Sequence, residues 1–411
     1  MVALRRPAHI HRQRCERILI YRLIFSIFLQ RIDVERAHRL ASRTLRILTA
    51  IPPVRGVFRR FLVPHDAAIR VEALGLTFSS PLSVAAGVDK DASWFESLGL
   101  IGFGCVEVGT VTANPQVGNP LPRVFRMTGD RALLNKMGFP NPGAKEIARR
   151  IADRRGDVVL GVNVGKSKLA PLEDVGQDYR ATVRLVAPFS DYLVINVSSP
   201  NTPQLREMQA VERLGPLIAD VRSELAAANV NPPILIKIGP DAENEQIDAV
   251  AKLAMSLALD GIIAVNTTED RSGLKESYDA IASVEGGGVS GAPLKARAVE
   301  VLERLHATVG ETLVLISVGG VGTPEDAWDR ILAGATLIQA HSGFIYGGPM
   351  WPRRVNRGLA RRVRAAGMSS IQELVGTGKQ HTAGASGDVS GSPTLPAVQD
   401  LAHSGPLSSV R

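Results

Sequence analysis

Residues 192–203 read YLVINVSSPNTP, an apolar run that ends in hydroxyl and amide side chains. The pattern recurs along the chain and marks eight candidate strands, at residues 82–87, 105–110, 158–165, 192–198, 234–239, 261–267, 313–319 and 337–342. Nearly all-apolar strands are typical of parallel sheets that are covered on both faces. Because helix-compatible stretches separate most of the runs, the sequence predicts an α/β fold, a (β/α)8 TIM barrel. A doubly wound open sheet is the alternative, but no GxGxxG motif follows the first strand.

The polar residues of these runs gather where each predicted strand ends. They occur in AAGVDK (85–90), EVGT (107–110), GVNVGK (161–166), IKIGP (236–240), VNTT (265–268), SVGGVG (317–322) and HSG (341–343). In a TIM barrel the carboxyl ends of the strands share one face, and that face holds the active site. We therefore expect these amide, hydroxyl and ammonium groups to converge on one site.

Two features of this face predict chemistry from the residues alone. The last two predicted strands end in Gly319-Gly320 and Ser342-Gly343, where barrels commonly bind phosphate through backbone N–H groups. This pattern predicts a ligand that carries phosphate. Lys237 lies inside an apolar strand, where an isolated charge is costly, so we expect it to serve the site. A structural ion pair is the alternative.

Other catalytic classes lack their motifs in this chain. There is no GxSxG elbow, no HExxH and no Walker sequence, and the eight histidines form no spaced cluster. We therefore expect no metal site. Two cysteines, Cys15 and Cys105, cannot supply a disulfide framework, which fits a reducing compartment.

Positive charge is concentrated at the N-terminus. The formal net charge is +8, but residues 1–60 hold fourteen arginines, no lysine and three acidic residues, a local net charge of +11. The slightly acidic remainder, and the absence of a nucleic-acid-binding motif, argue against a nucleic-acid partner.

The basic segment also carries helical patterns. Asp33 is placed as an N-cap before a helix that we expect to stop at Pro52-Pro53. One face of this helix is apolar (Val34, Ala37, Ala41, Leu45, Leu48) and the other basic (Arg36, Arg39, Arg43, Arg46). The preceding apolar run, 17–32, is too short to span a bilayer comfortably. The two helices predict a small hairpin in a membrane interface. A hairpin docked on the barrel with solvated arginines, and a mitochondrial targeting peptide in residues 1–16, are alternatives.

Nine segments, in this order, resemble dihydroorotate dehydrogenase: AAGVDKD, EVGTVTANPQVGNPLPRVFR, LLNKMGF, GVNVGK, INVSSPNTPQLR, IKIGPD, VNTT, GGGVSG and SVGGV. The likeness covers about residues 29–348, and QRIDVERAH (30–38) is similar to the N-terminal signature of the quinone-using class 2 enzymes. The resemblance implies oxidation of dihydroorotate to orotate in pyrimidine biosynthesis, with hydride transfer to one FMN that a membrane quinone, ubiquinone or menaquinone, reoxidises. It further implies a monomer bound peripherally to the cytoplasmic side of a bacterial cell membrane.

The resemblance also implies roles for individual residues. Ser199 matches the base that removes a proton from the substrate, and Thr202 matches a position that shapes its proton route. Positions that match substrate contacts are Lys90, Asn135, Lys136, Met137, Gly138, Phe139, Asn196, Asn201, Asn266 and Thr267. Positions that match flavin contacts are Ala86, Gly87, Lys90, Thr110, Asn163, Asn196, Lys237, Val265, Gly291, Gly320, His341 and Ser342. Val265 and His341 depart from the threonine and tyrosine that are frequent in relatives.

The expected organisation is an N-terminal extension (1–16), a membrane- and quinone-docking segment (17–62), the FMN-binding barrel (63–367) and a disordered tail rich in Gly, Ser, Thr and Pro (368–411). A second hypothesis is a catalytically silent barrel that binds a phosphate ligand and acts as a membrane-associated interaction module. The intact set of Ser199, Lys90 and asparagines argues against it.

Overall fold

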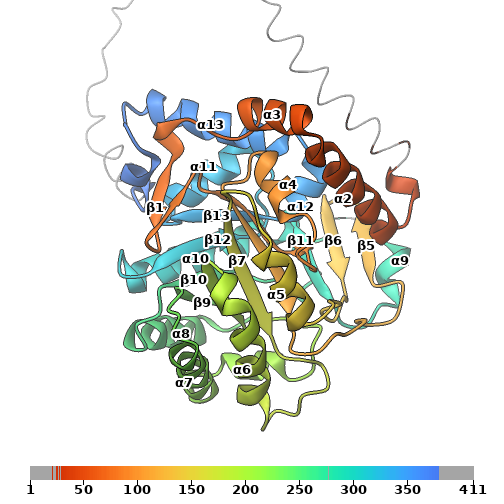
Figure 1. Cartoon of the computed structure of the whole chain (residues 1–411), viewed down its shortest axis with the longest axis vertical. Helices are drawn as coiled ribbons and strands as arrows, with labels where there is room; N and C mark the ends of the chain where they lie inside the picture. Colours follow the sequence, from red (N-terminus) through yellow and green to blue (C-terminus); the bar gives the residue numbers. More distant parts are fainter. Residues whose placement is uncertain (1–20, 22–24, 26, 28, 276, 379–411) are drawn as a thin grey trace, which may run out of the picture.

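A closed barrel of eight parallel strands forms the centre of the computed structural model, which describes residues 21, 25, 27, 29–275 and 277–378 (Figure 1). The strands are β3 (Leu82–Asp89), β4 (Cys105–Val111), β7 (Val159–Gly165), β8 (Tyr192–Asn196), β9 (Ile234–Ile238), β10 (Gly261–Ala264), β12 (Val314–Val318) and β13 (Leu337–Ala340). They follow one another around the barrel in chain order, and β13 pairs with β3 to close it. Each strand coincides with one predicted run, so the predicted (β/α)8 barrel is confirmed and the open sheet is excluded.

Helices surround the barrel and cover its outer face. They are α4 (Phe95–Leu100), α5 (Ala144–Ala152), α6 (Val175–Val186), α7 (Val211–Ala227), α8 (Asn244–Ser256), α10 (Lys295–Val309), α11 (Pro324–Leu332), α12 (Ser342–Gly347) and α13 (Trp351–Ala365). Each long helix turns an apolar stripe inward; α5, for example, buries Ala144, Ile147, Ala148 and Ile151. Because helices cover the strands outside and side chains fill the barrel inside, every residue of β4, β7, β8 and β9 is buried.

Two insertions build a small antiparallel sheet, here called the lid sheet. It consists of β5 (Val124–Met127), β6 (Ala132–Asn135) and β11 (Gly288–Gly291), in the order β11-β6-β5. The first two strands follow β4, and the third, with the short helix α9 (Asp279–Ala282), follows β10. The register places Gly288 opposite Asn135, so segments far apart in the sequence meet there. A further hairpin of β1 (Val71–Ala73) and β2 (Leu76–Phe78) precedes the barrel.

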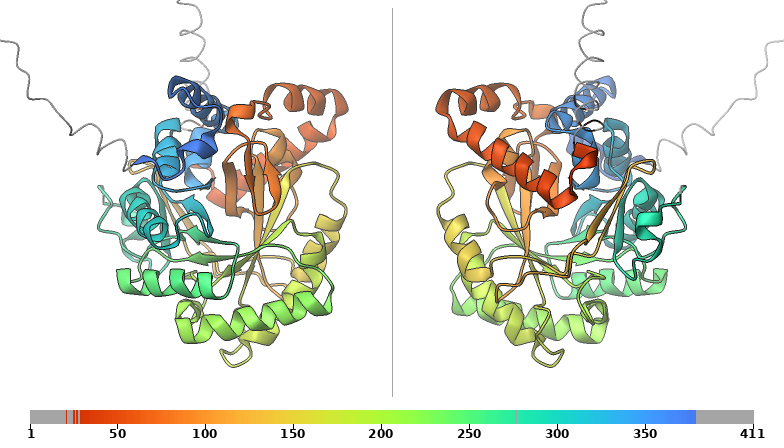
Figure 2. Two further views of the ribbon diagram at one scale, coloured as in Figure 1. Left: turned by 90° about the vertical axis from the view of Figure 1, so that its left-hand side faces the viewer. Right: turned by 90° about the vertical axis from the view of Figure 1, so that its right-hand side faces the viewer.

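The N-terminal hairpin is formed by α2 (Val34–Ala50) and α3 (Pro52–Phe61). As predicted, α2 begins after Asp33, whose carboxylate accepts a hydrogen bond from the Arg36 N–H. The expected stop at Pro52-Pro53 is confirmed, because α2 ends at Ala50. The sequence did not predict that the same two prolines begin a further helix, α3, although proline is tolerated in the first turn of a helix. The expected helix within 17–32 lies mostly outside the described residues. Figure 2 shows the α2–α3 hairpin beside α13 at one end of the molecule.

The folded chain continues past the expected start of the tail at residue 368. A single turn, η6 (Ile371–Leu374), buries both Ile371 and Leu374 against the barrel, so this boundary is corrected to a point after Gly378. The two apolar side chains explain why the segment packs. The rest of the expected tail, and residues 1–16, lie outside the described residues. Among the helices that the structure describes, none combines the length and the hydrophobicity needed to span a bilayer.

Candidate active site

One cavity of about 1070 Å3 opens over the carboxyl ends of the barrel strands. Its wall contains the ends of β3, β4, β8, β9, β12 and β13 together with residues of the lid sheet. From there the cavity continues between α2 and α3. A single space therefore joins the barrel to the N-terminal hairpin.

A buried carboxylate lies beneath the floor of this cavity. The side chain of Glu107 on β4 is fully buried, and its Oε1 lies 3.8 Å from Nζ of Lys237. The same carboxylate accepts hydrogen bonds from Asn163 Nδ2 at 2.8 Å and from Gln339 Nε2 at 2.5 Å. Buried charges are tolerated when they are paired and hydrogen-bonded in this way. Lys237 thus has the ion-pair partner that the structural alternative predicts. It also lines the cavity, so a role in the site stays a prediction.

Amide and hydroxyl groups from neighbouring strands form a network around this carboxylate. Asn163 Oδ1 accepts hydrogen bonds from Thr110 Oγ1 at 2.6 Å and from Asn196 Nδ2 at 3.1 Å. Asn266 Nδ2 donates to Ser198 Oγ at 3.1 Å. Because each group has a defined partner, the amides are held in fixed orientations at the cavity wall.

The loop after β8 brings Ser199 to the cavity. Ser199 is only 5% exposed, and its Oγ accepts a hydrogen bond from the backbone N–H of Asn201 at 3.2 Å. Asn201 Nδ2 in turn donates to Asn135 Oδ1 at 3.1 Å, so the loop is joined to β6 of the lid sheet. Thr202 Oγ1 is buried and has no hydrogen-bond partner in the described part of the chain. Two hydroxyl groups of one loop thus lie buried close to an amide-lined wall.

The loops after β12 and β13 approach each other through their backbones. Gly320 has a φ of +74°, and a Cβ on Gly343 would lie 2.0 Å from the carbonyl oxygen of Val321. Ser342 Oγ lies 2.8 Å from Ser290 Oγ of the lid sheet. Exposed main-chain groups in this part of a TIM barrel are suited to binding a phosphate.

Three basic side chains line the cavity where the barrel meets the hairpin. Burial lowers the pKa of Lys90 from its ordinary value. Burial, reinforced by the positive charge of Lys90, lowers the pKa of His38 to about 3 and that of His341 to about 4. Both imidazoles are therefore neutral near pH 7. His341 Nδ1 is buried and lacks a hydrogen-bond partner among the described residues.

The part of the cavity between α2 and α3 is apolar. Its lining includes Leu40, Leu45, Leu48, Phe58 and Phe61. Two arginines attach the start of the hairpin to the lid sheet. Arg123, directly before β5, has its Nε 2.6 Å from Glu35 Oε1 of α2. Arg126 of β5 donates through Nη1 to the carbonyl of Ile32, two residues before α2, at 2.7 Å. This end of the cavity suits a lipophilic ligand, and the helix that lines it is fixed to the lid sheet.

Most residues to which the resemblance assigned a role lie in the cavity wall. They are Ala86, Gly87, Lys90, Thr110, Asn135, Met137, Gly138, Phe139, Asn196, Ser199, Asn201, Lys237, Val265, Asn266, Thr267, Gly291, Gly320, His341 and Ser342. Three of the assigned residues do not line it, and one of them is Thr202, whose hydroxyl is buried in the Ser199 loop. Asn163 lies behind Thr110 and Asn196, and Lys136 Nζ donates instead to the Glu285 carbonyl at 2.6 Å.

Sequence analysis did not select Glu107, Gln339 or His38 as site residues. The signal for Glu107 was present, since it is a carboxylate inside the apolar run CVEVGTV in a fold that also buries a lysine. In the described residues, no group of three or more His, Cys, Asp and Glu side chains is arranged to hold a metal ion.

A closed (β/α)8 barrel whose polar strand ends share one deep cavity defines an enzyme of the TIM-barrel class. The sequence model described as dihydroorotate dehydrogenase matches residues 68–363, and the chain belongs to this family.

Individual relatives agree with the family. The chain is 51% identical over 363 residues to "Dihydroorotate dehydrogenase (quinone)" of Thermobifida fusca, covering 87% of this chain and 96% of that relative. It is 48% identical over 362 residues to the protein of the same name from Mycobacterium tuberculosis, covering 88% of this chain and 98% of the relative. Among solved structures, ligand-free DHODH of Eimeria tenella aligns with a TM-score of 0.71 at 36% identity, covering 76% of this chain and 92% of that chain.

Proposed function

We propose that the chain catalyses the quinone-dependent oxidation of dihydroorotate to orotate in pyrimidine biosynthesis. The observation that carries the proposal is the two-ended cavity, which joins a wall of amides and Ser199 to an apolar channel between two helices. A polar ring fits the first end and a lipophilic electron acceptor fits the second. The quinone-dependent relatives support the assignment, because they match over nearly their whole length.

Dihydroorotate dehydrogenases are flavin-dependent, and this cavity has features that fit FMN. The glycine loops after β12 and β13 offer main-chain groups for a phosphate, and Lys237 supplies a positive charge. Gln339 Oε1 and His341 Nδ1 are buried polar atoms without partners in the described chain, so a bound ligand could satisfy them. When bound, FMN accepts a hydride from the substrate and supplies the electrons that reduce the quinone.

In this proposal Ser199 is the base. Oxidation of dihydroorotate removes a hydride from one ring carbon and a proton from the adjacent carbon, and a double bond forms between the two. Ser199 Oγ takes the proton. A serine hydroxyl is a weak base, so the proton must move on. We assign this step to Thr202 of the same loop, whose buried hydroxyl has no other partner in the described chain.

The asparagines and Thr267 hold the substrate ring. Orotate and dihydroorotate present both N–H donors and carbonyl acceptors, and an amide side chain matches either kind. Asn135, Asn196, Asn201 and Asn266 all line the cavity and all make hydrogen bonds that fix their orientation. This prior fixation lowers the entropic cost of binding the ring in a reactive position.

The quinone would bind between α2 and α3, where the enzyme meets the membrane. Leu40, Ile47, Ile51, Val57 and Phe61 of the hairpin are exposed apolar residues, and Arg36, Arg39, Arg43 and Arg46 of α2 are exposed as well. Such a surface suits an interfacial position, with apolar groups in the bilayer and arginines at lipid headgroups. We propose peripheral binding to the cytoplasmic side of a bacterial cell membrane.

Anaerobic mixing of the purified protein with dihydroorotate tests the activity. We expect the yellow flavin to bleach, and a ubiquinone or menaquinone analogue to restore the colour. Recovery with NAD or fumarate but not with quinones would contradict the quinone assignment. A colourless protein that carries no flavin would favour the silent barrel.

A further inference from the structure

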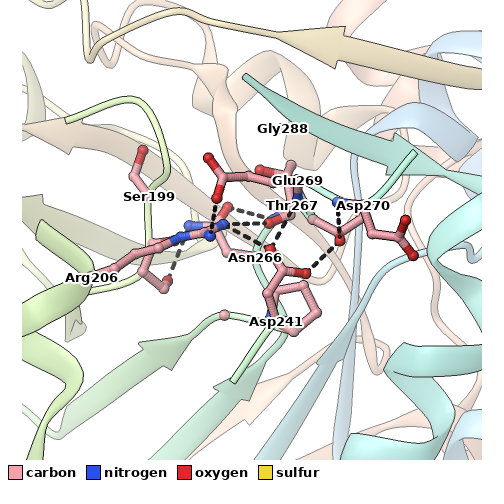
Figure 3. A network of polar contacts seen from close by, with 12 residues as sticks. Ser199, Arg206, Asp241, Asn266, Thr267, Glu269, Asp270 and Gly288 are labelled. Carbon is pink, nitrogen blue, oxygen red and sulfur yellow. Dashed lines mark hydrogen bonds and ion pairs between the residues drawn. The ribbon is translucent and has the colours of Figure 1, made fainter. Parts of the chain in front are cut away.

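Arg206 lies outside the cavity wall, yet it contacts three of the loops that form the substrate end. It belongs to η4 (Leu205–Gln209), a turn of 3-10 helix at the end of the loop that carries Ser199. Its Nε donates to the Ser198 carbonyl at 3.4 Å, and its Nη2 to the Thr267 carbonyl at 3.4 Å. Figure 3 shows the guanidinium between these loops.

Two carboxylates complete the surroundings of Arg206. Its Nη1 lies 2.7 Å from Glu269 Oε2, in the loop after β10, and its Nη2 lies 3.1 Å from Asp241 Oδ2, in the loop after β9. An exposed ion pair contributes little to stability by itself. A planar guanidinium that makes three hydrogen bonds and a further ion pair instead fixes the separation and orientation of the groups around it.

Asp241 extends the contact toward the lid sheet. It accepts hydrogen bonds from the Thr268 hydroxyl and, at 2.9 Å, from the Glu269 N–H. The backbone of Thr268 pairs with Val289 of β11. A Cβ on Gly288 of the same strand would lie 1.9 Å from Thr267 Oγ1, so this part of the lid sheet packs directly on a proposed substrate contact.

Both carbonyl groups that Arg206 holds adjoin proposed active-site groups. The Ser198 carbonyl belongs to the peptide bond that precedes Ser199, and the other carbonyl belongs to Thr267 itself. We infer that Arg206 is a positioning residue, which holds the Ser199 loop and the Thr267 loop at the separation needed for proton removal. The inference rests on the proposed function.

Arg206→Met tests this inference in the flavin-loaded, full-length enzyme. The rate of anaerobic flavin reduction at saturating dihydroorotate should fall about 10- to 100-fold, because a small misplacement of a base is costly to rate. Reoxidation of the reduced flavin by a soluble quinone should stay within about twofold of wild type, because the hairpin end of the cavity is untouched. Arg206→Lys, which keeps the charge but not the planar fork, should recover part of the lost rate.

Arg304→Met is the matched control. Arg304 on α10 pairs with Asp248 at 2.6 Å, and the two side chains are 33% and 28% exposed, close to the 29% and 28% of Arg206 and Asp241. We expect both half-reactions of this variant to stay within about twofold of wild type. If it slowed flavin reduction as much as Arg206→Met, general destabilisation would explain both variants and the inference would be overturned.

Two further outcomes are decisive. Wild-type reduction kinetics in both Arg206 variants, or an equal loss in both half-reactions, would remove Arg206 as a positioning residue and leave the proposed function intact. If dihydroorotate does not bleach the wild-type flavin, the proposed function fails first, and the inference fails with it.

Discussion

Ser199 is the residue on which the proposed chemistry depends most. Ser199→Ala should retain its flavin, because Ser199 Oγ has one backbone hydrogen bond and adjoins no glycine loop. Loss of the base should slow flavin reduction by dihydroorotate about 10²- to 10⁴-fold. Anaerobic stopped-flow absorbance measures this rate, and flavin content measured on the same sample serves as the control. A variant that reduces its flavin at nearly the wild-type rate would show that the base lies elsewhere.

His341 gives the unfolding free energy a defined pH dependence. Its pKa is about 4 in the folded protein and 6.5 in the unfolded chain, so between these values the unfolded state binds more protons. Stability is therefore lost as the pH falls, by about 2 kcal/mol from pH 7 to pH 5 for this one group. His341→Gln lacks this group, so between pH 7 and pH 5 its unfolding free energy should fall by about 2 kcal/mol less than that of the wild type. Urea unfolding at the two pH values measures this difference. The pKa of His38 is also lowered, but His38 is present in both the wild type and His341→Gln.

Two residues, Lys237 and Arg206, show that the sequence can indicate an unusual residue without indicating its partners. A lysine in an apolar strand predicts a role for Lys237, but its partner Glu107 lies three strands away around the barrel and comes near only because the barrel closes. Arg206 ends the segment INVSSPNTPQLR, but nothing in that segment indicates which residues it contacts. Its partners come from two other loops, so the residue types alone could not reveal the contact.

Among the elements, α2 is attached to the lid sheet by one largely buried ion pair. The side chains of Arg123 and Glu35 are only 12% and 16% exposed. Without Arg123, the largely buried Glu35 carboxylate would keep only the longer ion pair with the exposed Arg39, at 3.8 Å. Arg123→Met should free α2 and weaken the wall of the apolar channel. We expect slower quinone reoxidation, by about tenfold, with little change in flavin reduction by dihydroorotate. Measuring the half-reactions separately checks this, and equal losses in both would contradict it.

The strands that could be predicted from the sequence are those that are buried on both faces. Barrel strands covered on both faces read as unbroken apolar runs, and all eight were therefore found. The lid strands have four residues each, with an arginine in β5 and two glycines in β11, and no such run marks them. The start of α3 was missed because Pro52-Pro53 can either end a helix or begin one.

For the whole molecule, the division of charge predicts salt-dependent membrane binding. The N-terminal sixty residues carry a net +11 and the remainder −3. The full chain should bind vesicles that contain anionic lipid more tightly than neutral vesicles, and raising the salt from about 0.05 M to 0.5 M should release much of it. Cosedimentation measures the bound fraction. Removing residues 1–30 should reduce binding and quinone reduction far more than flavin content, and equal binding by both proteins would contradict this.

Because α2 is attached to the lid sheet, binding at the polar end of the cavity should affect the helix at its apolar end. Arg126 of β5 contacts Ile32, just before α2, and Arg123, just before β5, pairs with Glu35 of α2. The neighbouring strand β6 carries Asn135 at the substrate end. Orotate that orders Asn135 should therefore also slow amide hydrogen exchange in α2, at the far end of the cavity. Occupancy of the polar end would then be coupled, through a strand of four residues, to the order of the helix that lines the apolar end of the cavity.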